Sequence, residues 1–133
     1  MFYRSTNRRV NGKNFKDVLF EGLAPDGGLY MPESFPAVSK EFLKELPNKS
    51  FTEIALEISK LFISDIPEVE LKKIIEDAFS RESFLVEGEG FPTPLVKINE
   101  KLYAEELWHG PTMAFKDFGA RFMSRLMSYY LKN

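Results

Sequence analysis

One lysine has the sequence setting with the most specific chemistry in this chain. Lys116 lies between Phe115 and Phe118, a few residues after a Gly-Pro break and at the expected start of a helix. Apolar neighbours disfavour the ammonium form of a lysine, and so does the positive end of a helix dipole. A neutral amine is nucleophilic and can condense with an aldehyde. The local sequence therefore indicates a candidate Schiff-base lysine.

The same helix start could bind an anion, because the first turn of a helix carries free backbone N–H groups. A nucleophilic amine beside an anion site is the minimum equipment for holding pyridoxal phosphate (PLP) as a Schiff base. The alternative is a solvated lysine whose stem passes Phe115 and Phe118 with its charge in water. Local physics alone favours this alternative, because short motifs also occur by chance.

The composition argues against several other kinds of chemistry. The chain has no cysteine, which excludes disulfides and thiolate metal sites, and one histidine, His109, cannot build a multi-histidine zinc site. We therefore predict no metal. The net charge of −2 gives no reason to expect nucleic acid or an anionic membrane as a partner. No apolar run reaches membrane-spanning length and the start does not resemble a signal peptide, so we expect a cytoplasmic protein.

The first 80 residues are predicted to be helical. Ser50 and Glu53 have the spacing of a capping box, and the apolar residues that follow recur at helical intervals. A second helix is expected to start near Pro67, since proline is favoured in the first turn. Asn14 and Ser39 are suitable N-caps for two shorter helices.

The pattern changes near residue 81. Residues 84–86 could form a strand, 88–94 are expected to be loop, and two extended runs around Asn99–Glu100 predict a hairpin. A final helix is predicted over 115–131. Gly119 within it costs about 1 kcal/mol relative to alanine, which suggests close packing at that position.

The sequence thus divides into a helical region, 1–80, and a strand-loop-helix region, 81–133, that carries the lysine. With 133 residues, 44% of them hydrophobic, the chain is long enough to bury a real core. We expect it to be mostly α-helical, with a short β-hairpin before the lysine helix.

The run from His109 to Asp117 resembles the cofactor-lysine motif of threonine synthases almost residue for residue. Asn7-Arg8 departs from the Arg-Gly that is more usual near the family's opening. Four further segments are similar to the family's signatures or follow its order: 3–6, 22–30, 65–67 and 93–97. The resemblance therefore spans the chain from end to end.

This resemblance implies an α/β enzyme of PLP fold type II. Threonine synthases are lyases that convert O-phospho-L-homoserine and water to L-threonine and phosphate in threonine biosynthesis. Lys116 would hold PLP as a Schiff base and, once freed, act as general base. The resemblance raises this role of Lys116 above the solvated alternative.

Four neighbours of Lys116 are further candidates. Phe115 and Asp117 would contact the cofactor, although Phe115 could instead pack in the core and Asp117 could orient the lysine or only complement the helix dipole. Thr112 and His109 could line the substrate pocket or satisfy loop backbone groups. For His109 the structural role is favoured.

The family's glycine-rich phosphate loop and its Ser-Gly-Asp-Thr-Gly segment have no counterpart in this sequence. We therefore expect the N-terminal part of a threonine synthase, which needs the remainder of the polypeptide and is inactive by itself. Two alternatives stay open. One is a non-catalytic domain that associates, possibly with itself, through the apolar stripe of its last helix. The other is a lyase for a related phospho-amino alcohol.

Overall fold

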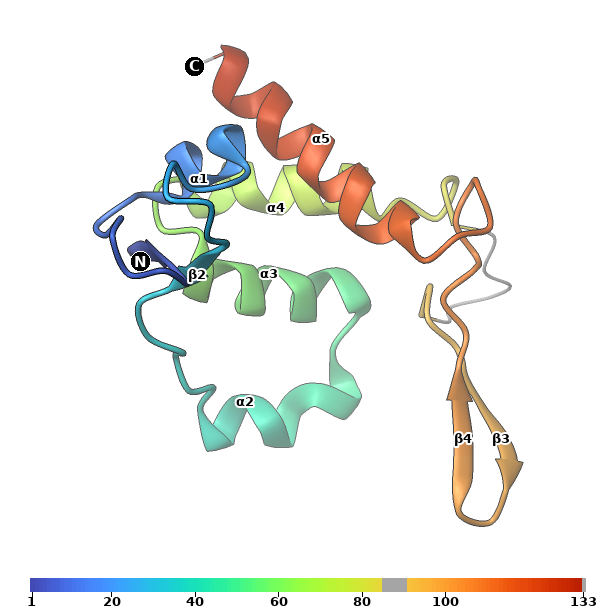
Figure 1. The fold of residues 1–133 in the computed structure, drawn as a ribbon. Helices are drawn as coiled ribbons and strands as arrows, with labels where there is room; N and C mark the ends of the chain where they lie inside the picture. Colours follow the sequence, from blue (N-terminus) through green and yellow to red (C-terminus); the bar gives the residue numbers. More distant parts are fainter. Residues whose placement is uncertain (85–90, 133) are drawn as a thin grey trace.

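The computed structural model describes residues 1–84 and 91–132. The described residues include five α-helices and one 3-10 helix, and a two-stranded hairpin extends away from them (Figure 1). The elements follow in the order β1 (Tyr3–Ser5), α1 (Phe15–Glu21), β2 (Tyr30–Pro32), α2 (Lys40–Glu45), the 3-10 helix η1 (Leu46–Asn48), α3 (Phe51–Phe62), α4 (Glu68–Ala78), β3 (Leu95–Asn99), β4 (Leu102–Glu105) and α5 (Lys116–Lys132). The prediction of a mostly helical chain with a hairpin before the lysine helix is confirmed.

Helix α4 is the centre of the core. Leu71, Ile75 and Ala78 lie on one face at intervals of four and three residues, and all three are completely buried. This face packs between α3 and α5, which lie on either side of α4 (Figure 1). The buried cluster comprises Leu56, Ile63, Ile66, Leu71, Ile74, Ile75, Leu126 and Tyr130. The core thus joins residues from both predicted regions, and the division at residue 80 stays a prediction.

Helix α3 begins at the predicted capping box. The Ser50 hydroxyl accepts a hydrogen bond from the Glu53 amide at 3.3 Å, and the Glu53 carboxylate accepts one from the Ser50 amide at 2.7 Å. Each bond satisfies a backbone donor that a helix start would otherwise leave free. This part of the prediction is confirmed, and it sets where the helix that supports α4 begins.

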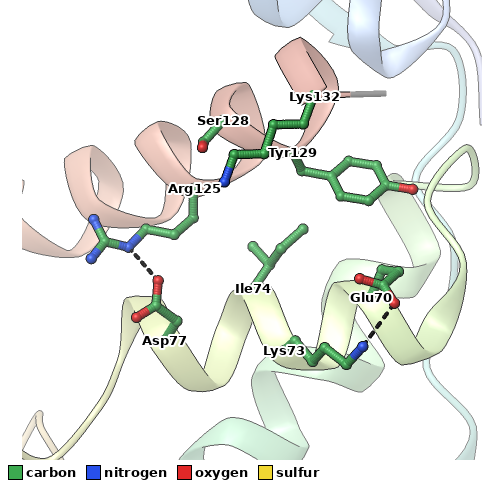
Figure 2. Close-up of a pocket in the computed structure, with 8 residues that line it drawn as sticks. All are labelled: Glu70, Lys73, Ile74, Asp77, Arg125, Ser128, Tyr129 and Lys132. Atoms are coloured by element: carbon green, nitrogen blue, oxygen red, sulfur yellow. Dashed lines mark hydrogen bonds and ion pairs between the residues drawn. The ribbon is translucent and has the colours of Figure 1, made fainter.

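Two arginines tie α5 to the end of α4. Arg121 Nε donates to the Ala78 carbonyl at 2.8 Å, and a second guanidinium nitrogen reaches the Ser83 hydroxyl. One turn later, Arg125 Nε lies 2.8 Å from a carboxylate oxygen of Asp77, across a pocket between the helices (Figure 2). The last carbonyls of a helix lack intrahelical partners and attract cations, so these contacts fix α5 along α4.

The N-terminal segments interlock around Asp26. Strands β1 and β2 pair antiparallel, and the Asp26 carboxylate accepts hydrogen bonds from the Ser5 hydroxyl and from the amides of Arg9 and Gly28. The Ser5 hydroxyl above all holds the pKa of Asp26 below its ordinary value. Tyr3 connects this unit to α3 by donating to the Phe62 carbonyl at 2.9 Å. The two N-terminal motifs thus form one support for the helices.

Two local predictions need correction. Gly119 does not mark close packing, because a Cβ built there meets no atom of the described residues within 4 Å. Phe84 lies in a bend and not in a strand, and its ring packs against Phe118 of α5 at a tilted angle, with ring centroids 4.8 Å apart. The rest of the predicted strand, 85–86, and residues 88–90 of the predicted loop lie outside the described residues.

Within residues 1–84 and 91–132, no helix is both long enough and apolar enough to cross a membrane.

The central place of α4 in the core predicts a large effect for one substitution. Ile75→Ala should lower the free energy of unfolding by about 2–5 kcal/mol, because it leaves a cavity at a completely buried position. Val69→Ala, on the exposed side of the same helix, should change it by less than about 0.5 kcal/mol. Urea unfolding followed by circular dichroism measures both. Similar midpoints for the two variants would mean that α4 is not the centre of the core.

Candidate functional site

The hairpin delivers the chain to the predicted lysine site. Strands β3 and β4 pair antiparallel, with Leu95 opposite Glu105 and Val96 opposite Ala104. The Glu106 amide donates to the Pro94 carbonyl at 2.9 Å and closes the base of the hairpin. From there a loop leads to the first residue of α5, which is Lys116. The predicted helix therefore forms, with its start one residue later than expected.

Lys116 and Phe115 both point away from the core. The lysine side chain is exposed, and Phe115 is 69% exposed. The alternative prediction, that Phe115 packs in the core, is therefore wrong for the described residues. Phe118, the other aromatic neighbour, packs inward against Phe84 and Phe79. The apolar surroundings that the sequence predicts for Lys116 are incomplete, because one ring faces solvent and the other faces the core.

The anion site predicted at the start of α5 is also only partly formed. The Asp117 amide donates to the Ala114 carbonyl at 3.0 Å, and the Phe118 amide donates to the Phe115 carbonyl at 3.3 Å. These bonds between residues three apart tighten the first turn. Two of the N–H groups that would face an anion are therefore already occupied.

Asp117, the residue after Lys116, points inward. Its side chain is buried, Oδ2 accepts a hydrogen bond from the Thr112 amide at 2.8 Å, and Oδ1 accepts one from the Thr112 hydroxyl at 2.6 Å. The hydroxyl contributes most to holding the pKa of Asp117 below its ordinary value, against the opposing effect of burial. We call these two bonds the Thr112–Asp117 pair.

Gly110 makes room for this pair. The residue is buried, and a Cβ built on it would lie 2.6 Å from the Asp117 Cβ and 2.5 Å from its Oδ2. In the segment between Gly110 and Asp117, Met113 adopts a positive φ of 55°, and its amide donates a hydrogen bond to the Gly110 carbonyl at 3.0 Å. The Gly-Pro-Thr-Met segment is thus a turn closed by Asp117. The role of Gly110 was not predicted, although the glycine itself is visible in the motif.

His109 is occupied by its neighbours in the loop. Its Nε2 lies 2.7 Å from a carboxylate oxygen of Glu106, and its ring stacks on Trp108 with centroids 5.9 Å apart. This arrangement fits the structural role that the sequence favours. Glu106 was not singled out from the sequence, although its spacing of three residues from His109 is visible there.

The structure thus brings all five predicted site residues together in one loop and one helix start, facing two ways. Lys116 and Phe115 face outward, and Asp117 faces inward to Thr112. Contacts of these residues with cofactor or substrate stay predictions. Among the residues that the structure describes, no three His, Cys, Asp or Glu side chains group in a way that could hold a metal ion.

The close approach of Asp117 to Gly110 predicts opposite effects for two glycine substitutions. Gly110→Ala should lower the free energy of unfolding by about 1–3 kcal/mol, because the new methyl group would overlap the Asp117 side chain. Gly119→Ala should raise it by about 1 kcal/mol, because that helical position is open. Thermal unfolding of both variants measures the difference, and equal stability of the two would contradict this geometry.

Comparisons with known proteins agree with the resemblance in the sequence. A family model described as threonine synthase N terminus matches residues 2–79. Threonine synthase-like 2 of Xenopus laevis is 39% identical over 99% of this chain, and threonine synthase of Pseudomonas aeruginosa is 36% identical over 98%. The chain spans 27% of the length of each of these two relatives.

Solved structures give the same result. A crystal structure of PLP-bound threonine synthase from Brucella melitensis superposes with a TM-score of 0.90 and 34% identity, covering 99% of this chain and 28% of that one. Threonine synthase from yeast superposes with a TM-score of 0.85 and 35% identity, covering 98% of this chain and 26% of that one. The predicted fold class is confirmed. Because the family model matches more than half of its residues, this chain belongs to the threonine synthase family and corresponds to its N-terminal portion.

Proposed function

We propose that this chain is the part of a threonine synthase that carries the cofactor lysine. The reaction would convert O-phospho-L-homoserine and water to L-threonine and phosphate, with PLP bound to Lys116 as a Schiff base. One observation carries the proposal: Lys116 is the first residue of α5 and is exposed, whereas the next residue, Asp117, is buried. A solvent-facing amine on a fixed helix end is open to a cofactor aldehyde.

The residues beside Lys116 fit the reactive end of PLP. Phe115 is exposed next to the lysine, so its ring is free to lie against a planar cofactor. The phosphate of PLP would find fewer hydrogen-bond donors here, since the amides of Asp117 and Phe118 already donate to carbonyls of the turn. We therefore propose that segments beyond this chain hold the cofactor phosphate and complete the substrate pocket.

In this proposal, Lys116 has two tasks. Its amine forms the covalent link to the cofactor, and after release it moves protons at the α and β carbons of the substrate. PLP, when bound, supplies an electron sink for the negative charge that forms on the substrate. Segments that cover the exposed Lys116 in the proposed enzyme would also exclude water from it.

The other four residues have different weights in the proposal. We propose no cofactor contact for the Asp117 carboxylate, because both of its oxygens already accept hydrogen bonds from Thr112. Thr112 and His109 stay candidates for substrate contact. Relatives named threonine synthase align over nearly the whole chain, which favours the lyase over a domain that only mediates association.

A lysine substitution in the complete enzyme tests the function. Lys116→Ala should abolish the visible absorbance of lysine-bound PLP and lower kcat by about 10² to 10⁴, the usual contribution of a positioned acid-base group, or more since the covalent link is also lost. Lys101→Ala, at the exposed hairpin turn, should leave both unchanged. Absorbance spectra and phosphate release report the two effects. Retention of absorbance and turnover by the Lys116 variant would refute the proposal.

A further inference from the structure

We propose that Asp117 is a positioning residue that sets the direction of Lys116 through its bonds to Thr112. This inference rests on the proposed function of Lys116 and adds a role for its neighbour. Asp117 would act on the reaction without touching cofactor or substrate.

Hydrogen bonds restrict where the Asp117 side chain can point. A carboxylate removed from water is stable only while its oxygens keep charge-assisted hydrogen bonds. Asp117 has them at 2.8 Å and 2.6 Å, from the amide and the hydroxyl of Thr112. Turning the side chain away would break both bonds at once. Its inward direction is therefore strongly preferred.

The direction of Asp117 also constrains the direction of Lys116, because the two are neighbours in α5. Neighbouring side chains on an α-helix point about 100° apart, because one turn takes 3.6 residues. When Asp117 is held against Gly110 inside the turn, the preceding residue is turned about 100° away from that side. This is what the structure shows, with Asp117 5% exposed and Lys116 on the surface. The Thr112–Asp117 pair thus acts together with the core packing of α5 to keep its first turn in the rotation that leaves Lys116 outside.

Hydrogen bonds within the chain make the turn before Lys116 rigid. The turn before Lys116 is held at several points: the Met113 amide bonds the Gly110 carbonyl, the Asp117 amide bonds the Ala114 carbonyl, and the carboxylate closes the turn onto Thr112. These bonds lie within the chain itself and need no ligand. A turn that is already ordered lets the amine meet an aldehyde without a further ordering cost. Breaking the Thr112–Asp117 pair should make that cost appear.

Thr112 offers a matched pair of variants. Thr112→Val keeps the shape but removes the hydroxyl donor, whereas Thr112→Ser keeps the donor. In this chain without cofactor, we expect Thr112→Val to speed hydrogen exchange of the amides of residues 112, 113 and 117 by roughly ten- to hundredfold, the factor for one lost hydrogen bond to a charged group. Thr112→Ser should stay within about threefold of the unaltered chain, and amides of α3 and α4 should not change. Asp117→Asn, which keeps the size, should give an increase in the same three amides.

The complete enzyme supplies the second measurement. Thr112→Val should slow Schiff-base formation between Lys116 and added PLP by roughly tenfold, and Thr112→Ser should restore the rate. Unchanged exchange in both Thr112→Val and Asp117→Asn would overturn the inference and leave the function of Lys116 intact. Faster exchange with an unchanged Schiff-base rate would also overturn it, since the pair would then only stabilise the turn. If PLP reacts equally well with the Lys116→Ala variant, the proposed function itself fails, and the positioning role fails with it.

Discussion

The buried face of α4 is the constraint on which the rest of this structure depends. Leu71, Ile75 and Ala78 have no exposed surface, and they bury the facing sides of α3 and α5 at the same time. Burial of apolar surface is not directional, so by itself it would let the helices slide. Arg121 and Arg125 remove that freedom, because their partners are the Ala78 carbonyl and the Asp77 carboxylate at the end of α4. The course of α5 follows from these two kinds of contact together.

This packing leaves the start of α5 at the surface, at the end of the loop that follows the hairpin. The core side of the helix is occupied by Leu126 and Tyr130, which are buried near its far end. Lys116 at the near end is therefore supported but not enclosed. A division of this kind, with rigid support behind and an open face in front, suits a residue that must react with a small molecule. In the proposed enzyme, other segments would close the open face.

Much of the helical framework could be predicted from the sequence, because its signals are local. The capping box at Ser50 and Glu53 formed as expected, and the apolar residues that follow it do lie in a helix, α3. The face of α3 that is buried was predicted less well, because its buried residue is Leu56 while Ile58 is exposed. The hairpin around Asn99–Glu100 also depends on a short stretch of sequence, and it formed. The lysine helix was predicted with an error of one residue at each end.

The detail of the site was less predictable, because it depends on which way a loop turns. Sequence spacing shows that Thr112 precedes Asp117 by five residues, but not that the loop folds back so that the two bond. Gly110 matters because a larger residue there would overlap the side chain of Asp117, seven residues later in the chain. The exposure of Phe115 and the openness at Gly119 depend on which other segments pack nearby, and periodicity carries no information on that.

Chemical trapping tests the central claim that Lys116 is the residue bound to PLP. In the complete enzyme, borohydride reduction converts the Schiff base into a stable bond to the lysine, and peptide mass spectrometry then locates it. The account predicts one modified site per chain, in the peptide that contains Lys116, with the label lost when excess O-phospho-L-homoserine is added before reduction. Stoichiometric labelling of a different lysine, with Lys116 unmodified, would contradict it.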